Sequence, residues 1–351
     1  MNFLKKTLVV SVRLTVIFSA LLSYASFAQN EMQDKQAELD SVPKQATEGY
    51  LKPRSLASIP EGTFGDKVRL GYKLFVDTQQ LTGKQVGNVL NCSNCHMNAG
   101  QQANASPLWA AYFAYPVYRK KNDKVNSYEE RLQGCFTYSM NGVAPAKLSP
   151  ELVALSAYSY WLAMSGLMDK YQVVGAVPEL SDEELVKGGK RADFPVPEVI
   201  KKALTVDQRA NLAGRGFPSI DKPKLAYSPE RGKLVYVNHC QACHGDNGQG
   251  LEMAGVYSLP PLWGENSFNW GAGMHRVNTA AYFIYENMPF AKALQLSNQE
   301  AWDVAAYINE HERPQDPRFK GDVNALKDRY HKHQGYYGEA VSASVLEAKK
   351  P

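Results

Sequence analysis

The sequence lacks several features that would assign it to a large class of proteins. Beyond its first 28 residues it has no apolar run near the roughly 20 residues that a membrane-spanning helix needs. Its formal net charge is only +4, so nothing indicates nucleic-acid binding or membrane binding. Cysteine is scarce, with five in 351 residues. An exported protein would normally use them in disulfides, but their spacing argues for another use.

The first 28 residues have the pattern of a secretory signal peptide. Three basic residues precede a short apolar stretch at 14–22, and small residues at Ser26 and Ala28 suit a cleavage site after Ala28. Removing this segment leaves 36 Lys and Arg against 35 Asp and Glu, so the net charge falls to +1. We therefore expect an exported, periplasmic protein without stable membrane insertion.

Four of the five cysteines fall into two copies of one motif. Residues 92–96 read CSNCH and residues 240–244 read CQACH, and both have the form C-x-x-C-H. This is the attachment box of c-type haem, in which two thiols bond to the haem and the histidine ligates its iron. A zinc site needs more Cys and His at close spacing. The sequence therefore predicts two covalently bound haem c groups, haem 1 held by Cys92, Cys95 and His96, and haem 2 by Cys240, Cys243 and His244.

The two boxes belong to an internal repeat. GYKLF (71–75) precedes the first box and GKLVY (232–236) precedes the second, while residues 147–163 and 295–310 each read as a serine-capped helix. The repeat predicts an all-α fold of two class I cytochrome c-type domains in tandem, joined by a Pro/Gly-rich connector. The predicted segments are a signal peptide (1–28), an N-terminal extension (29–60), domain 1 (61–170), the connector (171–225), domain 2 (226–315) and a C-terminal tail (316–351).

The tail is polar, and we expect it to be loose. His311, His331 and His333 lie in it or near it, and they are interpreted as solvated surface residues.

The second axial ligand of a haem iron governs its potential and reactivity. For haem 2 the candidate ligands are Met253, Met274, His275 and Met288. The sequence favours Met288, which precedes Pro289 and lies nine residues before Ser297, where class I cytochromes c place their distal methionine. Core packing is the alternative role for a methionine. A thioether ligand raises the potential, so haem 2 is expected to be the electron exit.

Two sulfur atoms compete for haem 1. The repeat alone assigns Met140, which lies nine residues before Ser149, and the protein would then be a dihaem electron carrier. That assignment leaves Cys135 as a spare thiol, although a lone thiol in an oxidising compartment tends to oxidise. The residues by themselves leave both ligands open.

Cys135 lies in a predicted short helix that begins after Ser127 and ends near residue 141. Arg131, Cys135 and Ser139 are spaced by four residues and fall on roughly one face. A neighbouring cation favours the thiolate, which is the better ligand and the better nucleophile. A basic run precedes this helix and contains Arg119, Lys120, Lys121 and Lys124. These residues are solvated surface charges, or one or two of them form an anion site together with Arg131.

Together these motifs resemble the periplasmic dihaem cytochrome c thiosulfate dehydrogenases, some of which act as tetrathionate reductases. The resemblance covers about residues 60–315 and rests on the two boxes, the C-x-x-x-S-x-N-G pattern at 135–142, NWGAGMHR (269–276) and ENMPF (286–290). It implies that Met140 packs in the core. The iron ligands that it implies are His96 and Cys135 for the active-site haem 1, and His244 and Met288 for haem 2.

The resemblance also implies a reaction, the joining of two thiosulfates to tetrathionate with release of two electrons. Cations offset the charge of the two anions, with Arg131 as the first candidate and Lys121 or Arg119 next. Cys135 is expected to bond to a sulfane sulfur and split the coupling into two steps. Ser139 binds a sulfonate oxygen or tunes the thiolate, or it is only a helix-terminal hydroxyl.

A small redox protein such as another cytochrome c is the expected partner. The alternative function is a non-catalytic dihaem electron-transfer cytochrome. A peroxidase is disfavoured because no well-placed histidine follows the first box before residue 239.

Overall fold

The structure is a computed structural model that describes residues 54–108, 111–112, 115–119, 122–163, 217–253, 255–290, 292–333 and 335–339. All of them belong to one compact unit, Gln45–Pro351. The predicted signal peptide and most of the predicted extension and connector lie outside the described residues. Among the described residues, no helix combines the length and apolar character that crossing a bilayer requires.

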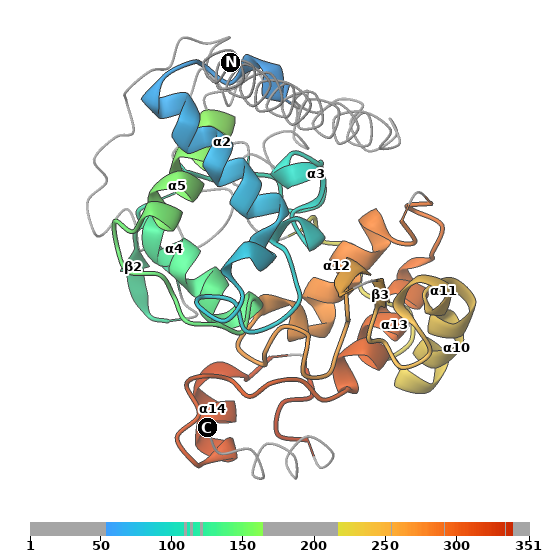
Figure 1. The fold of residues 1–351 in the computed structure, drawn as a ribbon. Coiled ribbons are helices and arrows are strands. Elements are labelled where there is room, and N and C mark those ends of the chain that lie inside the picture. Colours follow the sequence, from blue (N-terminus) through green and yellow to red (C-terminus); the bar gives the residue numbers. More distant parts are fainter. Residues whose placement is uncertain are drawn as a thin grey trace, which may run out of the picture. The chain divides into compact units, whose positions relative to one another are not determined.

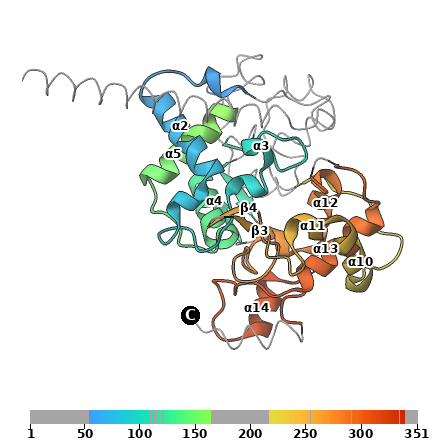
Figure 2. The same ribbon diagram turned by 45° about the vertical axis from the view of Figure 1, so that its right-hand side comes forward.

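The first half is built on two helices that pack against each other, α2 (Thr63–Val76) and α5 (Pro150–Ala163) (Figures 1 and 2). Gly71 permits their close approach, because a Cβ there would lie 2.0 Å from the Ala154 carbonyl oxygen. The side chains of Tyr158 and Trp161 on α5 are fully buried in the core of this half. The remaining helical elements are η2 (Leu56–Ser58), η3 (Thr78–Leu81), η4 (Cys92–Asn94), α3 (Met97–Gly100), α4 (Tyr128–Gly134) and the π-helix η6 (Cys135–Ser139).

The second half repeats this arrangement with α10 (Pro229–His239) packed on α13 (Asn298–Glu310). Gly232 occupies the corresponding crossing point, 2.0 Å from the Asp303 carbonyl oxygen if a Cβ were added. The predicted serine caps are present, since Ser297 accepts from Glu300 N in a capping box and Ser149 accepts from Leu152 N at 3.4 Å. The other elements are α11 (Gln241–His244), η9 (Gly273–His275), α12 (Val277–Asn287) and α14 (Val323–Tyr330).

The fold is helix-rich, as predicted, but it is not entirely α-helical. Strand β1 (Val117–Arg119) pairs antiparallel with β2 (Lys124–Asn126), and β3 (Leu251–Met253) pairs antiparallel with β4 (Val256–Leu259). These strands have three or four residues each, too few for an alternating pattern to stand out in the sequence.

The described part of the C-terminal segment is folded, so the expectation of a loose tail with a solvated His331 is wrong there. Val323, Leu326 and Tyr337 form a small apolar cluster with Trp270, and His331 is only 3% exposed. Because aromatic side chains of the tail cover Trp270, the segment packs instead of remaining in solvent.

Buried amides hold segments of the two halves together. Asn269 Nδ2 donates to Thr137 O at 2.9 Å, and Gln102 Nε2 donates to Asn287 Oδ1 at 2.9 Å. Asn88 Nδ2 reaches both Ser139 O and Ser267 O. Hydrogen bonds between the two halves therefore hold segments that lie near the first haem box in the sequence.

Candidate functional site

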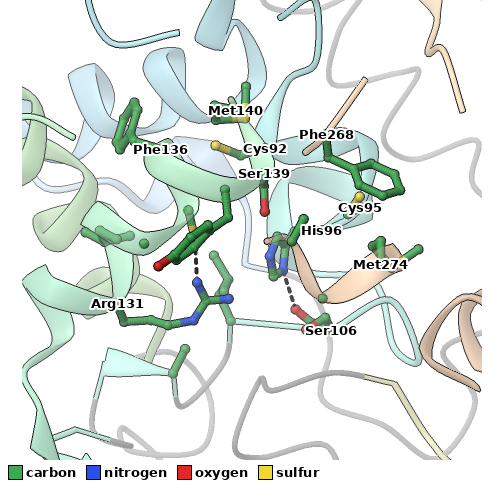
Figure 3. Close-up of a pocket in the computed structure, with 18 of the residues that line it drawn as sticks. Cys92, Cys95, His96, Ser106, Arg131, Phe136, Ser139, Met140, Phe268 and Met274 are labelled. Atoms are coloured by element: carbon green, nitrogen blue, oxygen red, sulfur yellow. Dashed lines mark hydrogen bonds between the residues drawn. The ribbon is translucent and has the colours of Figure 1, made fainter. Parts of the chain in front are cut away.

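A cavity of about 360 Å³ contains the first haem box (Figure 3). Cys92, Cys95 and His96 line it, and so do residues of α4 and η6 and of the loop from Phe268 to Arg276. Most of the remaining lining is apolar or aromatic. The cavity thus joins the predicted haem residues with the segment that carries Cys135.

The ring of His96 is oriented by a backbone carbonyl. His96 Nδ1 lies 2.7 Å from Ser106 O, so that nitrogen donates its proton and Nε2 is left to bind a metal. His244 has the same arrangement, with Nδ1 at 2.9 Å from Pro260 O. Burial and, to a smaller extent, the charge of Arg131 lower the pKa of His96 to about 4, although the hydrogen bond to Ser106 acts in the opposite direction. The imidazole is therefore neutral, as an iron ligand requires.

The box thiols are also in surroundings that suit haem attachment. Burial raises the pKa of Cys92 to about 12 and that of Cys95 to about 11. Thr78 donates its hydroxyl to Cys92 Sγ at 3.4 Å and accepts from Cys92 N at 3.0 Å. Two half-buried thiols, an oriented histidine and a largely apolar cavity fit a covalently bound haem c.

Cys135 begins a π-helical turn directly after α4. Ser127 and Glu130 form a capping box at the start of α4, which fixes the helix as the sequence predicted. The next turn is wider, because Met140 N donates to Cys135 O at 3.0 Å across five residues. Such π turns occur often at functional sites, and nothing in the residue pattern of this segment indicates one.

The structure brings Arg131 and Cys135 together. Arg131 Nη1 donates to Cys135 Sγ at 2.7 Å, the contact that the four-residue spacing makes possible. Cys135 is the largest cause of a raised pKa at Arg131. Cys135 also contributes to the raised pKa of both box cysteines, so its sulfur lies within electrostatic range of them.

Both candidate sulfur ligands line the cavity, but their surroundings differ. Met140 is 2% exposed and belongs to the core cluster of the first half. In Figure 3 it lies beside Cys92 and Phe136, away from Arg131. Cys135 is half-buried and has a cationic partner. Ser139 also lines the cavity, and its role there stays a prediction.

Cationic side chains reach the cavity from three segments. Arg119 at the end of β1 and Arg131 in α4 line it, as the basic run suggested. Lys121 and Lys120 lie outside the described residues. Arg276 lines the cavity as well, and the sequence analysis missed its role although NWGAGMHR ends on it. Burial lowers the pKa of Arg276, and Arg318 lowers it further.

The second haem box is more open than the first. Cys240 is half-buried and Cys243 is exposed, and His244 ends the short helix α11. Met288 directly follows α12, and Met288 and Cys240 pack against the same core cluster of the second half. The role of Met288 as iron ligand stays a prediction.

Known proteins match most of the chain. Residues 229–312, which contain the second box and Met288, match the family described as Cytochrome c. The chain is 42% identical to a thiosulfate dehydrogenase of Stutzerimonas stutzeri (strain A1501), over 95% of this chain and 96% of that protein. It is 40% identical to a thiosulfate dehydrogenase of Thiomonas intermedia (strain K12), over 94% of this chain and 92% of that protein.

A solved structure is similar as well. The "as isolated" form of thiosulfate dehydrogenase TsdBA from Marichromatium purpuratum is 39% identical and superposes with a TM-score of 0.69. The match covers 87% of this chain but only 59% of that chain, so this protein spans less than two thirds of it. The cytochrome fold and the haem c that the boxes predicted are thus common to this chain and its relatives.

Proposed function

The chain belongs to the thiosulfate dehydrogenase family, and on this basis we propose that it is a haem c oxidoreductase that oxidises thiosulfate. Two molecules are joined to tetrathionate, and the reverse reduction of tetrathionate runs at the same site. We also propose two tandem cytochrome c domains with one haem each, and a periplasmic location after removal of residues 1–28. The two C-x-x-C-H boxes and the leader pattern support these points.

One observation carries the proposal of a catalytic site, the 2.7 Å contact between Arg131 and Cys135 in the cavity of the first box. A carrier cytochrome needs a ligand there but no reactive thiol. A guanidinium held against a sulfur stabilises the thiolate, which is both an iron ligand and a nucleophile. His96 and Cys135 are therefore assigned to haem 1.

Electrostatics explains why the cavity contains arginine. Thiosulfate is a dianion, so coupling two of them brings four negative charges together. Arg119, Arg131 and Arg276 come from β1, α4 and the segment after η9, and all line the cavity. Fixed cations offset this repulsion at no cost of reorganisation. Lys121 remains a further proposed contributor from the same basic run as Arg119.

Cys135 divides the coupling into two balanced steps. Its thiolate and one thiosulfate form a Cys–S–S–SO₃⁻ adduct and lose two electrons. A second thiosulfate then attacks the sulfane sulfur of the adduct, which forms tetrathionate and restores the thiolate. Haem c, when bound, supplies one-electron acceptor sites for this oxidation. Ser139 lines the cavity, which supports its proposed role as a donor to a sulfonate oxygen or to the sulfur.

We propose that electrons leave through haem 2, with His244 and Met288 as its ligands. The exposure of Cys243 supports this direction, because it brings the haem attachment to the surface. A small redox protein such as another cytochrome c is the proposed partner there.

Met140 favours the second candidate function, that of an electron carrier. It lines the same cavity and holds the repeat position of Met288. In this case haem 1 would have His/Met ligation, and Cys135 would have no role at the iron.

Spectroscopy on the oxidised holoprotein separates the two functions. We expect the long-wavelength charge-transfer bands and EPR signals of a low-spin His/thiolate haem. Met140→Leu is expected to keep these signals, whereas Cys135→Gly removes them with both haem groups still attached. Spectra of two His/Met haems would leave the carrier function as the better description.

Activity provides the second test. Cys135→Gly is expected to lower turnover by at least about 1,000-fold, as for loss of a nucleophile. The assay runs in both directions, thiosulfate with an electron acceptor and tetrathionate with a reduced dye. Retained turnover in the variant would rule out the covalent mechanism.

A further inference from the structure

Three histidines lie together outside the haem cavity. His275 ends η9, His331 follows α14, and His333 lies two residues further on. One ring nitrogen from each falls within 4.8 Å of those of the other two. His275 is 2% exposed and His331 is 3% exposed. The cluster therefore links the loop of the second half to the C-terminal segment in a buried place.

Two of these rings are oriented by acceptors on their far sides. His275 Nδ1 is hydrogen-bonded to the Ala272 carbonyl oxygen. His331 Nε2 lies 3.0 Å from Asp316 Oδ2. Carbonyl and carboxylate oxygens only accept, so each of these nitrogens carries a proton. In neutral rings the opposite nitrogens, His275 Nε2 and His331 Nδ1, then carry lone pairs.

Those two lone-pair nitrogens face each other at 3.2 Å. Two acceptors at this distance need a cation between them, either a proton or a metal ion. A ring nitrogen aimed at the site, with the other nitrogen held by a carboxylate or carbonyl, is the usual arrangement of metal-binding histidines. The third imidazole, that of His333, adds a further donor to the same spot.

We propose that His275, His331 and His333 bind one divalent transition metal ion, with zinc as the best-fitting metal. Two nitrogens on one tetrahedral zinc, each about 2.0–2.1 Å from the metal, are about 3.4 Å apart. The observed 3.2 Å between His275 and His331 fits this separation. The His333 ligand nitrogen lies within 4.8 Å of the other two, so it needs an inward movement of up to about 1.4 Å to reach the same separation. Imidazole donors favour zinc or copper over calcium and magnesium, which take oxygen ligands.

Asp316 fixes the proposed ligand His331 through the hydrogen bond to its far ring nitrogen. It is fully buried, and Arg318 donates to both of its oxygens, Nε to Oδ1 at 2.9 Å and Nη2 to Oδ2 at 2.5 Å. Arg318 in turn lies 5.1 Å from the ring centre of Tyr138.

The site would join two segments that shape the haem cavity. Met274 and Arg276, on either side of His275, line that cavity, and so does Tyr138. Metal binding fixes His275 to the C-terminal segment and so restrains this loop. The role of the ion is structural, and the water or other ligand that completes four-fold coordination is not needed for chemistry.

The experiment uses holoprotein made without a histidine tag, dialysed against EDTA and then titrated with zinc chloride. Elemental analysis against haem iron gives the stoichiometry, calorimetry gives Kd, and zinc K-edge absorption gives the ligands. We expect one zinc per chain with three nitrogen neighbours at about 2.0–2.1 Å. Zinc should also raise Tm, because it binds only the folded state.

Matched variants test the assignment. His333→Gln is expected to weaken zinc binding by more than about 100-fold, and Asp316→Asn by about 10- to 100-fold. His311→Gln is the control, because His311 stacks on Trp263 at 4.0 Å outside the cluster. Wild-type holoprotein without stoichiometric zinc would overturn the proposal and leave a proton between the rings. Equal zinc affinity in the wild type and His333→Gln would overturn it too.

Discussion

At the scale of single residues, the decisive feature is a sulfur atom with its own cation. Arg131 reaches Cys135 one helical turn away, and its guanidinium is already in place before any substrate arrives. A charge-assisted hydrogen bond of this kind contributes about 1.5–3 kcal/mol. The spacing in the sequence predicted the contact because α4 is regular up to Gly134. It could not predict that the helix widens at Cys135.

Replacing Arg131 tests this contact directly. Arg131→Met removes the charge and the hydrogen bond but keeps an apolar stem, and we expect kcat/KM for thiosulfate to fall about 10- to 100-fold, as the loss of about 1.5–3 kcal/mol implies. Steady-state kinetics with an artificial electron acceptor measures this. Arg131→Lys keeps the charge without the planar fork and should give an intermediate value. Unchanged kinetics in both variants would show that the guanidinium does not assist the reaction.

At the scale of helices, the internal repeat has a structural cause. Gly71 and Gly232 fall in the repeated motifs before the two boxes, and both lie where an N-terminal helix crosses a C-terminal one. Only a residue without Cβ allows a carbonyl so close. Asp303 strengthens the second crossing, because its side chain accepts from Ser228 N and Arg231 Nε at 2.8 Å each.

The close contact of α10 with α13 at Gly232 predicts the effect of adding a single methyl group there. Gly232→Ala would place its Cβ 2.0 Å from Asp303 O, so the helices must separate, and we expect a loss of about 1–3 kcal/mol in the free energy of unfolding. Denaturant unfolding of the holoprotein measures it. Leu234→Ala on the same helix is the control, since Leu234 is 66% exposed and should change stability by less than about 0.5 kcal/mol. Equal effects of the two would contradict the crossing contact.

Helices with strong local signals were predictable, and elements without them were not. The serine caps and the apolar spacing predicted α5 and α13, and Ser127 predicted the start of α4. The hairpin of β1 and β2 lies in a basic run that reads as solvated charge. Its turn depends on Asp123 at φ +53, a conformation that side-chain type alone does not specify.

At the scale of the whole molecule, the site likewise has parts that the sequence predicts and parts that depend on the tertiary structure. The haem boxes are local motifs, so the sequence located them at once. The orienting carbonyls of Ser106 and Pro260 leave no trace in the sequence, because every residue has a carbonyl. Tertiary packing alone brings Arg276 to the haem cavity. It also brings the three clustered histidines together.

Through that packing, the second half holds the turn of the first half that carries Cys135, the proposed sulfur ligand. Asn269 is fully buried, and its amide donates to Thr137 O at 2.9 Å and Asn141 Oδ1 at 3.0 Å, while its oxygen accepts from Gly271 N at 2.9 Å. Thr137 lies in the π turn that begins at Cys135. The second half therefore holds the turn that sets the place of this sulfur.

Removing the Asn269 amide should release that turn. We expect Asn269→Ala to lower the free energy of unfolding by about 1–3 kcal/mol for each buried group left without a partner. It should also broaden or shift the EPR signals of haem 1, because the π turn that carries Cys135 loses its restraint. Asn266→Ala is the control in the same loop, since its side chain is exposed and makes only a 3.4 Å contact with Tyr257. A destabilised Asn269→Ala protein with unchanged EPR signals would mean that the amide supports the fold without positioning the ligand.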